Sequence, residues 1–106
     1  MTDNKRLALA KAVFPERDVA ENGLDGRTWI TTIDGAPSPW VPFDPANNGD
    51  QAIAVLAWLL RNFRCDLSHN AVTVWHSNDI LICDIDYDGT AAGLRKAVTE
   101  AGMRVV

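Results

Sequence analysis

The stretch Cys83–Ala101, CDIDYDGTAAGLRKAVTEA, predicts a β-strand that turns into an α-helix. Apolar and acidic residues alternate in its first half, which is the period of a half-buried strand. Thr90 is a favourable N-cap, and Leu94 and Val98 recur at helical spacing after it. Gly102 is expected to end the helix in the left-handed conformation. This segment indicates an α+β fold.

A second strand is predicted just upstream of this one. Val72–His76 and Ile80–Tyr87 are rich in β-branched and aromatic residues, and Ser77–Asp79 can form the loop of a β-hairpin. With that loop, Cys83 is expected opposite Thr73. The residues of the second strand that face the core are then predicted from their alternation: Cys83, Ile85 and Tyr87.

The strongest helical signal lies further upstream, in Ala52–Phe63, with Asn48 or Asp50 as its cap. An apolar stripe is predicted on this helix: Ile53, Leu56, Leu60 and Phe63. Val55, Trp58 and Leu59 cover much of the remaining circumference, and a helix of this kind needs burial on more than one side. Two interpretations stay open: complete burial within one chain, or a homodimer through Ala52–Leu60.

The N-terminal part contributes a helix that Pro15 ends, followed by a polar loop over residues 16–26. Arg27–Ile33 reads as a strand. The proline-rich stretch 36–45 is expected to be an extended connector or edge segment, in which Trp40 and Phe43 cover the core.

The tail over residues 103–106 is a candidate edge strand. The resulting prediction is a single α+β domain over residues 1–106, in the order α-β-α-β-β-α. In it, a small antiparallel sheet packs with two or three helices.

Composition excludes several classes of protein. The chain has 106 residues, with 10 Lys+Arg against 14 Asp+Glu and a formal net charge of −4. Direct nucleic-acid binding is not expected, because it depends on clustered basic side chains. The longest apolar run, Ala52–Leu60, is too short to span a bilayer, and residues 1–15 lack a signal-peptide pattern. A soluble cytoplasmic protein without membrane contact is expected.

Asp84, Asp86 and Asp88 form the first half of a calcium-loop pattern. The twelfth position of that pattern requires glutamate, and Arg95 occupies it. The preceding element also reads as a strand where the motif expects a helix. The favoured interpretation is therefore a row of carboxylates on one exposed strand face, with Asp88 close to the N-terminus of the last helix.

The sequence gives little support for a zinc site or for a catalytic or phosphate-binding motif. Four residues could ligate zinc, but their spacing places His76 and Cys83 too far apart for one ion: Cys65, His69, His76 and Cys83. No nucleophile elbow or glycine-rich phosphate loop is present. We therefore predict no cofactor, no metal and no catalytic residues.

Three features carry a family resemblance: Trp29, the segment Phe43–Leu60 (FDPANNGDQAIAVLAWLL) and the segment Asp88–Ala101 (DGTAAGLRKAVTEA). With the order of elements, they make the chain similar to the phage ABA sandwich domain family, small proteins of tailed bacteriophages and prophages. The resemblance implies an accessory product made in the infected bacterium, and it provides no catalytic residues.

The predicted function is therefore non-enzymatic binding of a host protein with a basic surface, in the bacterial cytoplasm. Inhibition of a host defence system, of the anti-CRISPR or anti-restriction type, is one form of this. The predicted partner-binding residues are Asp84, Asp86, Asp88, Trp40 and Asp44. The alternative is a domain that binds a cation or small ligand through Asp84, Asp86 and Asp88.

Overall fold

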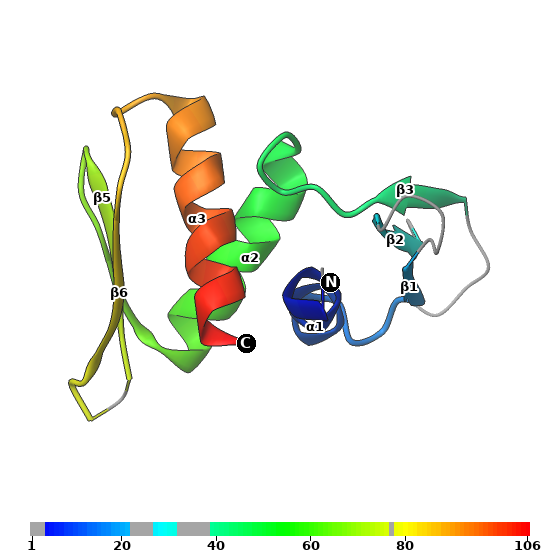
Figure 1. Ribbon diagram of the computed structural model, residues 1–106, viewed down its shortest axis with the longest axis horizontal. Coiled ribbons are helices and arrows are strands. Elements are labelled where there is room, and N and C mark those ends of the chain that lie inside the picture. The colour runs from blue at the N-terminus through cyan, green and yellow to red at the C-terminus, as the bar shows by residue number, and fades with distance from the viewer. Residues whose placement is uncertain (1–3, 22–26, 32–38, 77) are drawn as a thin grey trace. The chain divides into compact units, whose positions relative to one another are not determined.

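The computed structural model describes residues 4–21, 27–31, 39–76 and 78–106, which form three helices and six short strands (Figure 1). In chain order these are α1 (Asn4–Val13), β1 (Val19–Glu21), β2 (Thr28–Thr31), β3 (Trp40–Pro42), α2 (Gly49–Asn62), β4 (Arg64–Leu67), β5 (Ala71–Trp75), β6 (Leu81–Asp86) and α3 (Ala91–Val105). The α+β class is confirmed. The predicted order α-β-α-β-β-α is wrong, because the observed order is α-β-β-β-α-β-β-β-α. The strands form two antiparallel three-stranded sheets and not one.

The chain divides into two compact units. The first holds Met1–Asp44 together with Val106, and it contains the sheet β1-β2-β3. The second holds Pro45–Val105, and it contains the sheet β4-β5-β6. The expectation of one domain over residues 1–106 stays a prediction.

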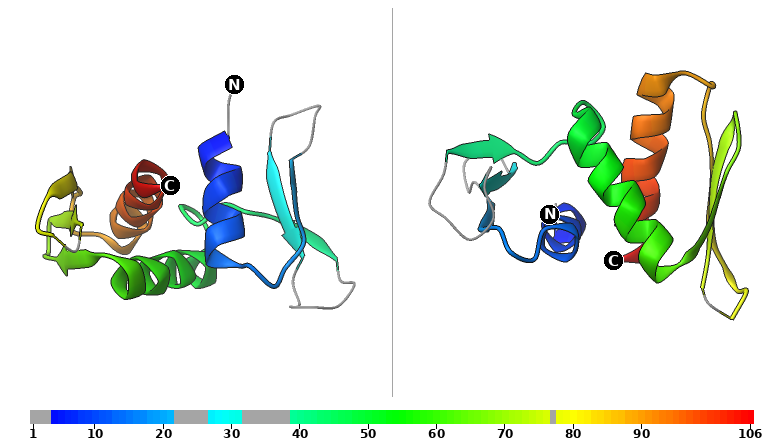
Figure 2. Two further views of the ribbon diagram at one scale, coloured as in Figure 1. Left: turned by 90° about the horizontal axis from the view of Figure 1, so that it is seen from below. Right: turned by 180° about the vertical axis from the view of Figure 1, so that it is seen from behind.

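In the first unit, α1 packs against β1 and β2 (Figure 2). The central strand is β2, in which Ile30 lies opposite Val19 of β1 and opposite Val41 of β3. Ile30 is fully buried, as are Leu9 and Ala10 of α1. Apolar side chains of α1 and β2 therefore contribute the core of this unit.

One strand of the first unit departs from the sequence-based expectation, and another agrees with it. The predicted loop over residues 16–26 is wrong for Val19–Glu21, because these residues pair with β2 as β1. The proline-rich connector contains β3, which lies at the sheet edge, where proline in a strand is tolerated. Of the predicted strand Arg27–Ile33, the structure describes residues 27–31, and residues 32–38 lie outside the described part.

The expectation that Trp40 and Phe43 both cover the core is half right. Phe43 is 1% exposed and meets Phe14 edge to face, with ring centroids 6.2 Å apart. Trp40 is 46% exposed. Phe43 therefore belongs to the core of the first unit, whereas Trp40 presents much of its ring to solvent.

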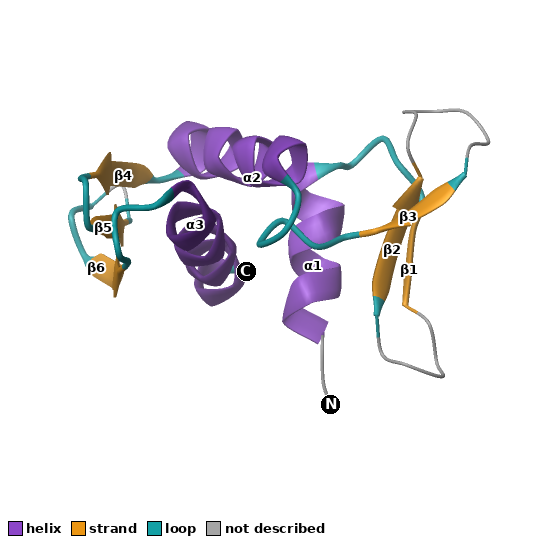
Figure 3. Ribbon diagram, turned by 90° about the horizontal axis from the view of Figure 1, so that it is seen from above, coloured by secondary structure: helices purple, strands orange, loops and turns teal. Residues whose placement is uncertain are grey.

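In the second unit, α3 packs on one face of the sheet β4-β5-β6, and α2 runs beside α3 on that same side (Figure 3). The buried residues alternate along β5 and β6, as predicted. They are Val72, Val74, Cys83 and Ile85, and they meet Ala97, Val98 and Ala101 of α3 in the core.

The predicted hairpin of β5 and β6 is present, with a shift in register. His76 N–H donates to the carbonyl of Ile80 at 2.8 Å. Cys83 lies opposite Val74 and not opposite Thr73, so that detail of the prediction is wrong. A β-bulge next to Val74 adds one residue to the β6 side and causes the shift.

The buried face of α2 is not the predicted stripe. Ala52, Val55 and Leu59 are buried, whereas Ile53 is 67% and Leu60 is 53% exposed. Within its unit, α2 packs chiefly against α3 and β4. One face of the helix is therefore buried, and a second apolar face is left in contact with solvent.

The structure selects Asn48 from the two caps predicted for α2 and confirms Thr90 as the cap of α3. Asn48 is the N-cap of α2, and its Oδ1 accepts a hydrogen bond from Gln51 N–H at 3.1 Å. Thr90 precedes α3, and its Oγ1 accepts a hydrogen bond from Gly93 N–H at 3.0 Å. These bonds satisfy backbone donors that the first turn of a helix leaves without an internal partner.

The predicted end of the last helix is wrong. Gly102 lies inside α3 and is buried, and the helix continues to Val105, so residues 103–105 form no edge strand. Burial of this turn outweighs the cost of about 1 kcal/mol that glycine brings to a helix interior. Among the described residues, no helix is long and apolar enough to cross a membrane.

Candidate functional site

Three residues from three strands form a row across the sheet β4-β5-β6. Thr73 of β5 lies opposite Asp66 of β4 and opposite Asp84 of β6. Residues directly opposite one another in antiparallel strands point to the same face of the sheet. Val72 and Val74, on either side of Thr73, are fully buried on the side of α3. The row therefore lies on the face turned away from α3.

A further carboxylate joins this row. Asp86 is two residues beyond Asp84 in β6, and Asp66, Asp84 and Asp86 are all exposed. We call Asp66, Thr73, Asp84 and Asp86 the acidic face. Thr73 Oγ1 donates to Asp84 Oδ1 at 3.0 Å, which orients that carboxylate. Two carboxylates about 7 Å apart repel by only about 0.6 kcal/mol in water, so the face tolerates its charge while hydrated.

A basic side chain borders the acidic face. Arg64 lies opposite Trp75, and its guanidinium lies 4.9 Å from the centre of the indole ring. Its Nη1 also forms an ion pair with Asp79 Oδ1 at 2.8 Å, in the turn between β5 and β6. The charge of Arg64 is thus directed to Asp79 and to the ring of Trp75.

Asp88 differs from the two aspartates of β6. The strand ends at Asp86, and the carboxylate of Asp88 accepts hydrogen bonds from Thr90 N–H at 3.0 Å and from Thr90 Oγ1 at 2.6 Å. These hydrogen bonds hold the pKa of Asp88 below its ordinary value. The predicted position at the start of the last helix is confirmed, and the side chain is engaged there.

A shallow groove of mixed polar and apolar lining joins the end of β6 to α3. Asp86 and Asp88 line it from one side, and Lys96 and Glu100 line it from α3. The groove has a volume of about 390 Å³. Asp86 therefore contributes both to the acidic face and to the edge of the sheet beside α3.

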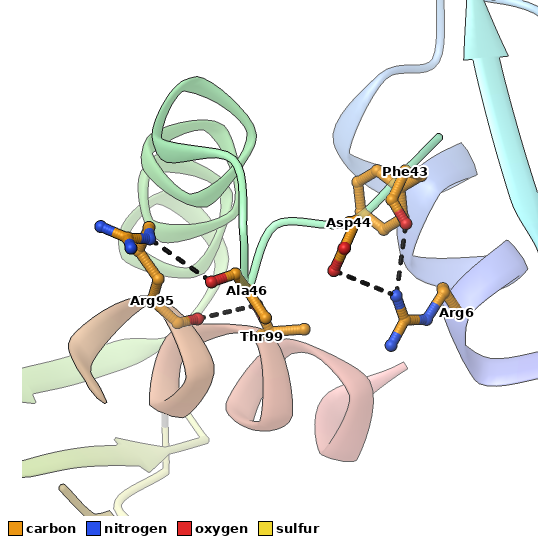
Figure 4. A network of polar contacts seen from close by, with 6 residues as sticks. All are labelled: Arg6, Phe43, Asp44, Ala46, Arg95 and Thr99. Carbon is orange, nitrogen blue, oxygen red and sulfur yellow. Dashed lines mark hydrogen bonds and ion pairs between the residues drawn. The ribbon is translucent and has the colours of Figure 1, made fainter. Parts of the chain in front are cut away.

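Trp40 and Asp44, the other predicted partner-binding residues, belong to the first unit. Asp44 Oδ1 forms an ion pair with Arg6 Nη1 at 3.7 Å, and the same nitrogen donates to the carbonyl of Phe43 at 3.3 Å (Figure 4). Asp44 thus has a role in closing its own unit. The acidic face consists of second-unit residues alone.

The two cysteines lie on the same face of the sheet but on its two outer strands. Cys65 of β4 and Cys83 of β6 both lie opposite Val74, about 10 Å apart across two strand spacings. This separation exceeds the reach of a disulfide, and both thiols are free. Burial raises the pKa of both thiols. In the described ranges, no three metal-binding side chains gather into a group that could hold an ion.

Arg95, which occupies the glutamate position of the calcium-loop pattern, has a structural contact. Its Nε donates to the carbonyl of Ala46 at 3.3 Å, and Thr99 Oγ1 donates to the carbonyl of Arg95 at 2.8 Å (Figure 4). Arg95 therefore joins α3 to the turn that precedes α2.

Sequence reasoning missed Asp66 and Thr73 as members of the acidic face. The strand β4 was not predicted, since Arg64–Leu67 is short and follows directly on α2. A signal was present in Ser68 and Asn70, two turn-forming residues in front of a predicted strand. Comparison of the chain with protein-family models, curated proteins and solved structures gives no match. The similarity to the phage ABA sandwich family stays a prediction.

Proposed function

We propose that this chain is a non-enzymatic binding protein whose acidic face docks on a basic protein surface. The observation that carries the proposal is the row Asp66–Thr73–Asp84 with Asp86 beside it, on the sheet face turned away from α3. Three carboxylates projected from a hydrogen-bonded sheet are held at nearly fixed spacing. Such a surface gains orientation and association rate from a complementary positive surface.

The distribution of charge supports a protein partner. The formal net charge is −4, which disfavours the phosphate backbone of a nucleic acid as ligand. The bordering Arg64 is already paired with Asp79, so it does not neutralise the three carboxylates. The partner that fits has clustered Lys or Arg side chains.

The resemblance to small phage proteins supports a setting for this binding. In that setting the chain acts in the cytoplasm of an infected bacterium, and its partner is a host protein. Defence nucleases fit the required chemistry, because their nucleic-acid grooves are lined with Lys and Arg. Occupation of such a groove by the acidic face would exclude the nucleic acid, which is inhibition of the anti-CRISPR or anti-restriction type.

A pair of charge-matched triple variants tests the proposal. The first is Asp66→Asn with Asp84→Asn and Asp86→Asn. The second is Glu16→Gln with Asp18→Asn and Glu21→Gln, three exposed carboxylates of the first unit. Both remove three negative charges. Proteins captured from a bacterial lysate are quantified with wild type and with both variants, at about 0.05 M and about 0.5 M salt.

The expected result is a basic protein that wild type and the control variant retain at low salt and that the acidic-face variant loses. Retention should fall at high salt, because exposed charges are screened. Equal retention by both variants contradicts the proposal. Equal loss with both variants assigns the effect to net charge and also contradicts it.

A further inference from the structure

A second surface of this protein lies on α2 and is independent of the acidic face. Ile53 and Leu60 are 67% and 53% exposed, and they stand seven residues apart, which places them on one side of the helix. Ile53 and Leu56 line a groove of about 210 Å³ with Leu94 of α3. We propose that a second copy of this chain packs on this apolar surface, with the two α2 helices antiparallel.

Packing of α2 within its own unit does not depend on the apolar side chains of Ile53 and Leu60. The core contacts of α2 are made by Ala52, Val55 and Leu59, which lie on a different side of the helix from Ile53 and Leu60. Substitution of an exposed residue outside the core usually has little effect on stability. The apolar character of the outer side is therefore available for association.

Two charges on α2 fit a second copy. Asp50 lies in the first turn and Arg61 in the last turn, and both are exposed. At about 100° per residue, Asp50 lies about 70° and Arg61 about 90° from the line midway between Ile53 and Leu60, both on the same side of it. Each helix therefore carries an acidic end and a basic end along one border of its apolar surface.

An antiparallel two-fold pair joins these features. A two-fold axis that lies in the interface between the helices, perpendicular to both helix axes, exchanges the two copies, reverses the helix direction and keeps the side to which each residue leans. Asp50 of one copy then lies opposite Arg61 of the other, at both ends of the contact. Ile53 of one copy lies beside Leu60 of the other. In a parallel two-fold pair, the two copies of each charge would instead lie at the same height on opposite borders of the contact, and Asp50 would not meet Arg61.

The size of the surface determines how strong this association is. A helix of 14 residues is about 21 Å long, so one helix face covers much less than the roughly 800 Å² per partner of a standard interface. The dimer is therefore in exchange with the monomer and dissociates on dilution.

Sedimentation velocity over a dilution series tests the proposal with two isoleucine variants. Wild type should shift from 11.6 kDa towards twice that mass as its concentration rises from about 5 µM to about 1 mM. Ile53→Lys should raise the dissociation constant at least about tenfold, since it would bury a charge. The control is Ile80→Lys, which changes an isoleucine that is 58% exposed in the β5–β6 turn and should associate like wild type.

Charge reversal tests the antiparallel arrangement. Asp50→Arg alone and Arg61→Asp alone each place like charges together and should weaken association, whereas the double variant should restore it. Circular dichroism checks that each variant is folded. A wild type that stays monomeric up to about 1 mM overturns the proposal, as does Ile53→Lys associating like wild type. A double variant as weak as the single variants overturns the antiparallel pairing.

Discussion

Asp88 accepts both hydrogens that Thr90 can donate, from the backbone N–H at 3.0 Å and from the hydroxyl at 2.6 Å. Thr90 Oγ1 in turn accepts from Gly93 N–H at 3.0 Å. The three residues form one chain of hydrogen bonds that leads from the end of β6 into α3. Since α3 covers the sheet, this chain of bonds positions the helix that holds the acidic face in shape.

Thr90→Ala removes the centre of this chain of hydrogen bonds. We expect the free energy of unfolding to fall by about 1 kcal/mol, the usual cost of losing a threonine N-cap. For a domain of this size the melting temperature should drop by about 4–8 °C. Thr90→Ser keeps the hydroxyl and is the control, so equal melting temperatures of the two variants would contradict this role.

Acid should weaken the contribution of Asp88. Its pKa is lowered in the folded protein, so its contribution is complete above the ordinary aspartate value of about 3.9 and is lost as pH falls through the folded pKa. Wild type should therefore be more stable than Asp88→Asn at pH 7, and this difference should shrink as pH falls below the ordinary aspartate value. NMR titration of the Asp88 carboxyl checks the cause, because Thr90→Ala should move its pKa back up.

Two glycines at helix starts should respond differently to alanine. Gly49 has open space where a Cβ would lie, so Gly49→Ala should raise the free energy of unfolding by up to about 1 kcal/mol. At Gly93 a Cβ would overlap the carboxylate of Asp88. Gly93→Ala should therefore be at least about 1 kcal/mol less stable than Gly49→Ala in urea denaturation. Equal stabilisation by both would contradict the position of the Asp88 side chain.

Adjacent leucines on α2 test which side of the helix is buried. Leu59 is fully buried and Leu60 is 53% exposed. Leu59→Ala should cost about 2–5 kcal/mol, whereas Leu60→Ala should change stability by less than about 0.5 kcal/mol. Denaturant unfolding at low protein concentration, where the chain is monomeric, makes the comparison. A larger loss of stability for Leu60→Ala than for Leu59→Ala would contradict this burial and would support the apolar stripe predicted from sequence.

Calcium distinguishes protein binding from the alternative of a cation site at Asp84, Asp86 and Asp88. Asp88 is engaged by Thr90 and Arg95 by Ala46, so we expect no change in melting temperature with millimolar calcium. A site with a dissociation constant a hundredfold below the calcium concentration would add about 2.7 kcal/mol of stability. A clear rise in melting temperature that Asp84→Asn abolishes would favour the alternative.

Features with a local signal were predictable from sequence. Asn48 and Thr90 were found as caps because a cap needs only a polar side chain two or three residues from its N–H partner. The β5–β6 hairpin was found from alternation and its turn. The exposure of Asp84 and Asp86 followed from the same alternation.

Features that depend on distant contacts were not predictable in this way. β1 is a strand only because Val19 pairs with Ile30, and β4 only because Cys65 pairs with Val74. Gly102 stays helical because its turn is buried. Asp66 could not be assigned to the acidic face from the sequence, because its position opposite Thr73 depends on the register between β4 and β5.

The position of α3 after β6 has a consequence for synthesis on the ribosome. The apolar side of the sheet β4-β5-β6 is covered by α3, the last element of its unit to be made. In the first unit the helix precedes its strands, so the core residues of α1 and of its sheet, with Phe43 directly after β3, are all made before the second unit begins. The second core must wait for a further helix after its sheet is made. During that interval the apolar side chains of Val72, Val74 and Ile85 are exposed to solvent. We therefore expect the incomplete second unit to be the species that chaperones bind most readily and that aggregates most readily.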